Sequence, residues 1–197
     1  SVGGSKTDPG GDVVVTAGRS FSHSGGAISF TAGESTSTSS GAVVVKSTNA
    51  GNFGVSGFLS FTSGTTSSGS SGHIQIATGD ATGGSGGDIL VSVGESKTDP
   101  GGDVVVTAGH SFSHSGGSIS LTAGAGTSRS SGAVVVKTMN AGTNGVSGML
   151  SFTSGTTSSG SSGHIQIASG DATGGKGGDI LVSVGGSKTD PGGDVVV

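Results

Sequence analysis

The sequence has no cysteine, tryptophan or tyrosine, and only 10% of its residues are charged. The missing cysteines exclude a disulfide scaffold and a cysteine-based zinc site. No apolar run approaches the roughly 18 residues of a membrane-spanning helix. The net charge of −4 is spread thinly and gives no electrostatic case for nucleic acid. Hydrophobic residues make up 29%, too few for a conventional enzyme core, so we expect neither an enzyme nor a cofactor.

Small polar residues take the place of the missing types, and they are ordered in a repeat. Glycine supplies 44 of the 197 residues, serine 39 and threonine 22. The segment that begins at Ser1 recurs from Ser92 and again from Ser183, and 77 of the 91 positions of the first two copies match. We expect one continuous segment, 1–197, with super-repeats 1–91 and 92–182 and a partial copy 183–197. The third copy ends in mid-motif, so we expect a window of a longer array.

A shorter repeat of about 15 residues lies inside each super-repeat. Every unit has a glycine, a stretch in which apolar and other residues alternate, and a polar Gly/Ser/Thr arc. The alternation predicts a short strand in each unit, and no helical spacing is present. The side chains expected to face inward form the predicted structural core: Val13, Val15, Ile28, Phe30, Val43, Val45, Leu59, Phe61, Ile74, Ile76, Ile89 and Val91.

Stacked strand-arc units predict an all-β protein, a β-solenoid. One unit per coil would place Asp88 against Asp103, a like-charge neighbour. Two units per coil, about 30 residues, set small apolar pairs against large ones and keep the apolar volume of each coil nearly constant, and the super-repeat then equals three coils. Three units per coil also avoid the aspartate clash but distribute the phenylalanines less evenly. We therefore favour two units. The one extra residue per super-repeat falls in the arcs 46–56 and 137–147, where an insertion costs least.

The repeat resembles the Ser/Gly-rich 15-residue repeats of uncharacterised algal secreted or surface proteins, on segments such as 24–33 and 71–79. Its general plan is similar to that of β-solenoid adhesins and fibre proteins. The resemblance covers the whole chain. It implies an extracellular or cell-surface location and an architecture, and it carries no catalytic residues.

Three groups of polar residues are candidate binding sites. The segments around Asp88 and Asp179 fit a calcium β-roll pattern, but they occur only once per super-repeat, so they are weak calcium candidates. The Asp8–Asp12 segment and its copies favour a turn over a cation site. His73 and His164 head predicted strands, where we expect polar pairing with Asp103 and Asp194 rather than a metal site. No triad or other catalytic spacing appears.

The outward positions predict one apolar column and one hydroxyl column. The apolar column repeats along the array and forms a possible lateral interface, made of Val14, Val44, Val105 and Val135. The hydroxyl column pairs Ser29 with Thr31 and Ser60 with Thr62, and such an array of hydroxyl groups suggests an ice-binding surface. Leu90 and Leu181 interrupt this column.

These patterns favour a structural protein, a stiff extracellular fibre, filament or surface stalk that forms by axial stacking of β-coils. The expected partners are other copies of the chain, stacked axially and in lateral contact, and the Ser/Thr arcs offer hydroxyl groups for O-glycans. We expect no nucleic acid and no membrane span. An ice-binding or carbohydrate-binding adhesive module is the alternative function.

Overall fold

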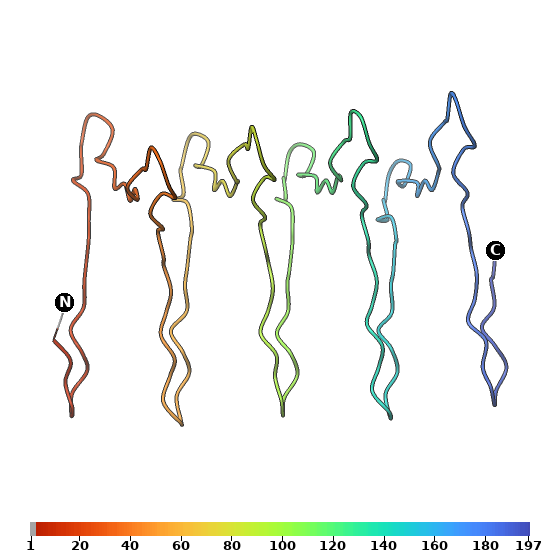
Figure 1. The fold of residues 1–197 in the computed structure, drawn as a ribbon, viewed down its shortest axis with the longest axis horizontal. Helices are drawn as coiled ribbons and strands as arrows, with labels where there is room; N and C mark the ends of the chain where they lie inside the picture. Colours follow the sequence, from red (N-terminus) through yellow and green to blue (C-terminus); the bar gives the residue numbers. More distant parts are fainter. Residues whose placement is uncertain (1–2) are drawn as a thin grey trace. The chain divides into compact units, whose positions relative to one another are not determined.

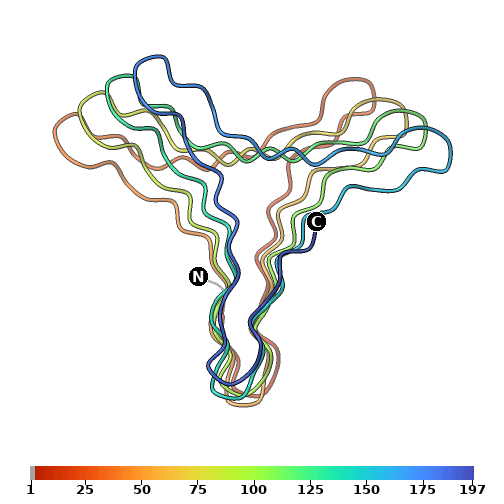
Figure 2. The same cartoon turned by 90° about the vertical axis from the view of Figure 1, so that its right-hand side faces the viewer.

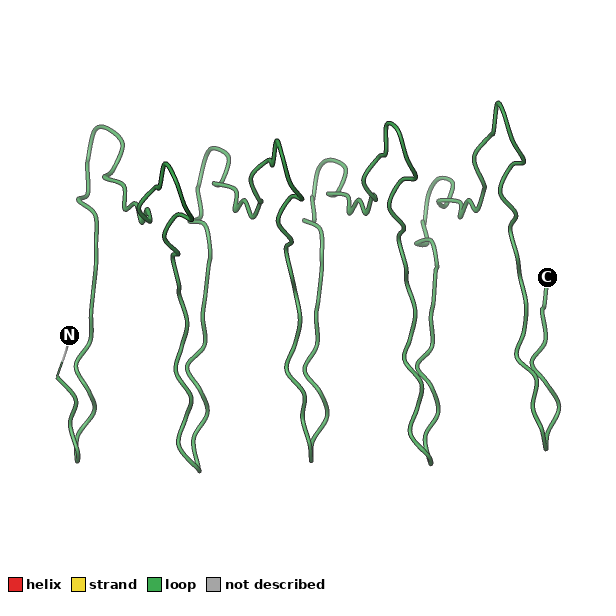
Figure 3. Ribbon diagram, viewed as in Figure 1, coloured by secondary structure: helices red, strands yellow, loops and turns green. Residues whose placement is uncertain are grey.

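The computed structural model describes residues 3–197, and within them it contains neither a helix nor a strand (Figure 3). The backbone consists of extended stretches joined by bends. The predicted β-solenoid is therefore wrong for this chain. Extended backbone becomes a strand only when its N–H and C=O groups pair with a neighbour, and here the extended stretches lack such ladders.

Backbone hydrogen bonds between separate positions are few in the described part of the chain, and they are local. Seven are present, and six of them join glycines eight residues apart, such as Gly26 N–H to the Gly18 carbonyl at 2.9 Å. The seventh runs from Gly54 to Gly51. No ladder forms because a stretch of about six residues cannot offset the backbone entropy that a Gly/Ser-rich chain loses on ordering.

The bends recur at nearly regular intervals and fall in the polar arcs. Most are three-residue bends, and the arcs with the extra residue hold a two-residue turn instead. The bends lie at 6–8, 21–23, 36–38, 67–69, 82–84, 97–99, 112–114, 127–129, 158–160, 173–175 and 188–190, and the turns at 52–53 and 143–144.

Contacts between Cα positions divide the chain into two units, Ser1–Gly102 and Asp103–Val197, and each is described by itself. Within the first unit the path of the backbone repeats after three 15-residue repeats. The bend 6–8 and the turn 52–53 point to one side, and the bends 21–23 and 67–69 point to another (Figures 1 and 2). The favoured arrangement of two repeats per coil is therefore also wrong. It assumed facing strands that the chain does not form.

No side chain is buried among residues 3–197. The twelve side chains of the predicted core are all exposed, from 47% for Ile28 to 75% for Phe30 and Ile76. The described part of the chain therefore closes no core within itself. Six of its residues are half-buried, and they are Ala17, Ser20, Ala32, Ala108, Ser111 and Ala123. Each lies between the large apolar residues of its repeat and the bend that follows them.

The search for a helix long and apolar enough to cross a membrane found none in residues 3–197.

Candidate functional sites

The most defined local structures are six nine-residue loops, each closed by a hydrogen bond between its first and last glycine. We name them glycine-closed loops, and they span 3–11, 18–26, 33–41, 109–117, 124–132 and 185–193. The N···O distances lie between 2.8 and 3.4 Å. The closing glycine approaches the preceding turn closely. A Cβ built on Gly26 or Gly117 would lie 3.2 Å from the opposing glycine nitrogen. A Cβ at these positions would therefore require the opposing glycine to shift by a few tenths of an ångström.

A serine hydroxyl holds the bend inside several of these loops. Ser20 Oγ accepts a hydrogen bond from the backbone N–H of His23 at 3.0 Å, and Ser111 Oγ accepts one from His114 at 3.0 Å. Ser35 and Thr38 repeat the arrangement at 3.0 Å. The hydroxyl satisfies an N–H that has no backbone partner in the bend, as a serine does at a helix N-terminus. The serines are visible in the sequence, but the sequence pattern did not predict that each would accept the backbone N–H three residues later.

An exposed phenylalanine lies in loops 18–26 and 109–117. Phe21 is 89% exposed and Phe112 is 98% exposed. The Arg19 guanidinium stands 4.3 Å from the centroid of the Phe21 ring, which is a cation–π distance. In the second copy a histidine replaces this arginine, and the rings of His110 and Phe112 meet edge to face at 4.7 Å. The same local cluster thus survives a change of partner.

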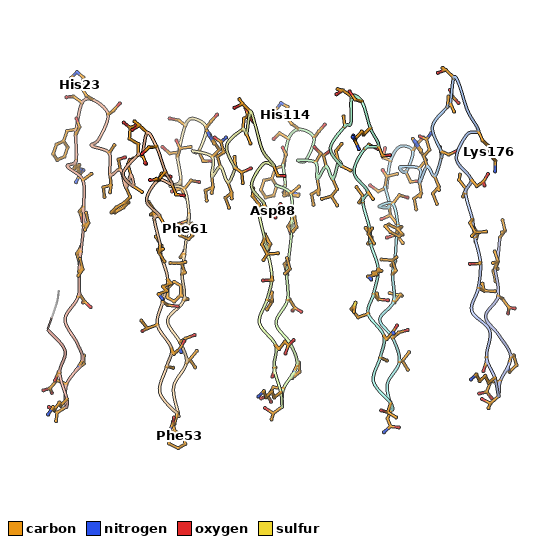
Figure 4. The ribbon with its side chains drawn as sticks, in the orientation of Figure 1. His23, Phe53, Phe61, Asp88, His114 and Lys176 are labelled. Atoms are coloured by element: carbon orange, nitrogen blue, oxygen red, sulfur yellow. The ribbon has the colours of Figure 1, made fainter. Side chains whose placement is uncertain are left out.

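The bends also carry histidines that reach outward. His23 and His114 lie at the outer ends of their loops (Figure 4). Ser22 Oγ lies 3.0 Å from His23 Nδ1. In the described chain no three histidine or acidic side chains come together in a way that could hold a metal ion.

The weak calcium candidates occupy exposed backbone in both copies. The Lys176 ammonium lies 2.9 Å from Asp179 Oδ2, and the two side chains are 80% and 75% exposed. Ser85 stands at the equivalent position beside Asp88 in the first copy. Asp179 thus has a cationic side chain as its partner, whereas Asp88 has a serine at that position.

The Asp-Pro-Gly-Gly-Asp segments begin with a serine-held turn. Ser5 Oγ accepts the backbone N–H of Asp8 at 2.9 Å, and Thr7 Oγ1 donates to Asp8 Oδ2 at 3.1 Å. The same two contacts recur at Asp99 and at Asp190, with distances from 3.0 to 3.1 Å. The carboxylate of this aspartate is thus engaged with its own neighbour in all three copies.

The residues of the two predicted columns are exposed, as are those of the predicted core. The four valines of the possible lateral interface are 73% to 82% exposed. On the hydroxyl side, Ser120 Oγ and Thr122 Oγ1 lie 3.5 Å apart, so residues two apart do share a side there. Residues 3–197 enclose no pocket.

The comparisons with known proteins identified no relative. No family model, no curated protein and no solved structure matches the chain.

Proposed function

We propose that the chain is part of an extracellular structural protein whose copies associate into a fibre, filament or surface stalk. The observation that carries this proposal is the exposure of every large apolar side chain of the 15-residue repeat, between 47% and 119%, in residues 3–197. Burying one such side chain contributes about 1.5–3 kcal/mol. A chain that leaves so many of them in water gains stability by covering them with other copies.

The composition supports association between copies. Charged residues make up 10% of the chain and the net charge is −4, so electrostatic repulsion between copies is weak. The apolar residues recur at matching positions of each super-repeat. Each super-repeat therefore offers the same apolar surface to another chain. The extracellular placement rests on the resemblance of the repeat to secreted and surface proteins, and antibody labelling of intact cells tests it.

A dilution series followed by analytical ultracentrifugation and electron microscopy tests the association. We expect the chain to be monomeric when dilute and to form elongated assemblies as its concentration rises. The chain carrying Val14→Ser, Val44→Ser, Val105→Ser and Val135→Ser should need a concentration at least about tenfold higher, which corresponds to about 1.4 kcal/mol of lost association energy.

The matched control carries four changes in the hydroxyl column, Ser29→Thr, Ser60→Thr, Ser120→Thr and Ser151→Thr, and it should assemble like the unmodified chain. A chain that stays monomeric at every concentration would contradict the proposed function. Equal loss of assembly in both variants would show that the valine column is not the interface.

Ice or carbohydrate binding is a second candidate, favoured by the shared side of Ser120 and Thr122. Regularly spaced hydroxyls could order water or bind sugar hydroxyls across an open surface. Thermal hysteresis and glycan-array binding test this alternative, and the Ser-to-Thr variant above should change either activity without changing assembly.

A further inference from the structure

Every proline of the chain follows an aspartate. The sequence has three prolines, Pro9, Pro100 and Pro191, and they are preceded by Asp8, Asp99 and Asp190. Each Asp–Pro pair stands at the same position of the 91-residue super-repeat. Cutting all three bonds would release segments 9–99 and 100–190, each one full repeat of 91 residues. Each 91-residue super-repeat thus contains one Asp–Pro peptide bond.

An Asp–Pro bond is labile in acid because a nucleophile and a good leaving group flank the same carbonyl carbon. A side-chain oxygen of the aspartate attacks its own main-chain carbonyl carbon, and a C–O bond forms that closes a five-membered anhydride. The C–N bond to proline breaks, and the nitrogen of this tertiary amide leaves as a secondary amine that takes a proton from solution. Water then opens the anhydride to two carboxyl groups, so one water is consumed per bond.

The structure leaves this bond open to solvent in all three copies. The aspartate and the proline are exposed at each site. The backbone N–H of the aspartate is held by a serine hydroxyl at 2.9 to 3.1 Å, so the pair sits at the end of a bend. Proline has no N–H, so no hydrogen bond donated by its nitrogen ties the Asp–Pro peptide unit to the rest of the chain. The aspartate Oδ2 accepts a hydrogen bond from the hydroxyl of the preceding threonine in all three copies.

We propose that the three Asp–Pro bonds are acid-cleavable sites that divide the array into single super-repeats. Acid and water are the only reagents, and no protease is needed. The proposal does not rest on self-association, since the Asp–Pro bonds are exposed to solvent in the single chain. Other aspartates lie in similarly exposed backbone before valine or isoleucine, and they provide the comparison: Asp12, Asp88, Asp103, Asp179 and Asp194.

The test is incubation of the dilute full chain in dilute formic acid, followed by mass spectrometry, with a neutral incubation beside it. We expect segments 9–99 and 100–190 as the main products, and cleavage at the Asp–Pro bonds at least about tenfold faster than at the other aspartates. Cleavage spread evenly over all aspartates, or no cleavage, would overturn the proposal.

Two variants separate the roles of the two residues. Pro100→Ala keeps the carboxylate and removes the leaving group, and Asp99→Asn keeps the proline and removes the carboxylate. Each should leave segment 9–190 intact while the bonds at Asp8 and Asp190 are still cut. Full cleavage of the Pro100→Ala chain at residue 99 would overturn the assignment of proline as the leaving group.

A short peptide with the sequence of residues 5–12 tests the structural part of the argument. Its bond should break at a rate within about twofold of the rate in the full chain, because the chain does not shield the site. A much slower rate in the full chain would show that the site is protected. Loss of assembly without a change in these rates would bear on the proposed function alone.

Discussion

The backbone N–H of Gly117 donates to the carbonyl oxygen of Gly109 at 2.8 Å, and Gly26 and Gly18 repeat this contact at 2.9 Å one super-repeat earlier. The two pairs close loops of equal length around the same Ser-Phe-Ser-His sequence. In a chain without helix or strand in its described part, these contacts are the main fixed points of the backbone.

Changing the closing glycine should open its loop. Gly117→Val places a β-branched side chain where a Cβ would already lie 3.2 Å from the Gly109 nitrogen and 3.4 Å from the Ala108 Cβ. We expect the amide of residue 117 to exchange with solvent faster, as measured by NMR. Gly109→Ala is the control, since nothing lies within 4 Å of its Cβ position and it should leave the exchange rate unchanged.

The serine that holds the bend should matter more than its neighbours. Ser111→Ala removes the acceptor of the His114 N–H at 3.0 Å and should weaken the bend by about 0.5–1.5 kcal/mol. The chemical shifts of residues 112–114 should move toward random-coil values. Ser113→Ala changes an exposed serine in the same bend and should leave them in place. Equal shifts in both variants would contradict the role of Ser111.

Loops 33–41 and 124–132 are equivalent in the two super-repeats but differ at one residue of the bend, and this difference predicts the effect of a substitution. Ser35 holds the bend of loop 33–41, whereas Gly126 occupies the equivalent position of loop 124–132. A Cβ at Gly126 would lie 2.6 Å from the Ser130 carbonyl oxygen. Gly126→Ser should therefore force this loop into the conformation of loop 33–41, visible as a new protected amide at residue 129. Retention of the original shifts would contradict this expectation.

Substitution of Phe61 should affect association between chains without affecting the conformation of the single chain. The side chain is 66% exposed, so Phe61→Ser should leave the far-UV circular dichroism of the dilute chain unchanged, with the spectrum of a coil. The same change should raise the concentration needed for assembly. Ser60→Thr adds a methyl group at the neighbouring position and should affect neither measurement. A loss of ordered spectrum in dilute Phe61→Ser would show that the side chain is buried within one chain.

Calcium should have no specific effect on the chain. Asp179 pairs with Lys176, and Asp88 has a serine in the place of that lysine. Titration with calcium chloride, followed by NMR at residues 83–90 and 174–181, should give only the shifts that the same ionic strength of sodium chloride gives. Saturable shifts at both aspartates would restore the calcium site that the once-per-repeat spacing argues against.

The sequence pattern located the bends better than it described the segments between them. The bend 21–23 falls in the polar arc after Gly18, and the turn 52–53 falls in the arc with the extra residue. Glycine and serine favour bends by local chemistry, which a sequence displays directly. Strand formation depends on a partner at a distance, and alternation at Val13 and Val15 says only which side chains share a side.

The choice between two and three repeats per coil failed for a related reason. Matching the volumes of Val13 and Val15 with Ile28 and Phe30 presumes that these residues face one another across a closed core. All four are exposed, so their volumes place no constraint on the path of the backbone. The candidate loops were missed because their determinants, a pair of glycines eight residues apart and a serine between them, are hidden among many glycines and serines.

The glycine-closed loops also give the chain a reserve of length. Each loop folds nine residues back on themselves and is held shut by one hydrogen bond between its glycines. Such a bond contributes about 0.5–1.5 kcal/mol, little more than the thermal energy, so pulling on the ends opens the loops one after another. Each opening releases roughly 20 Å of backbone. A tether built from this chain would therefore lengthen under small loads and shorten again when the load is removed.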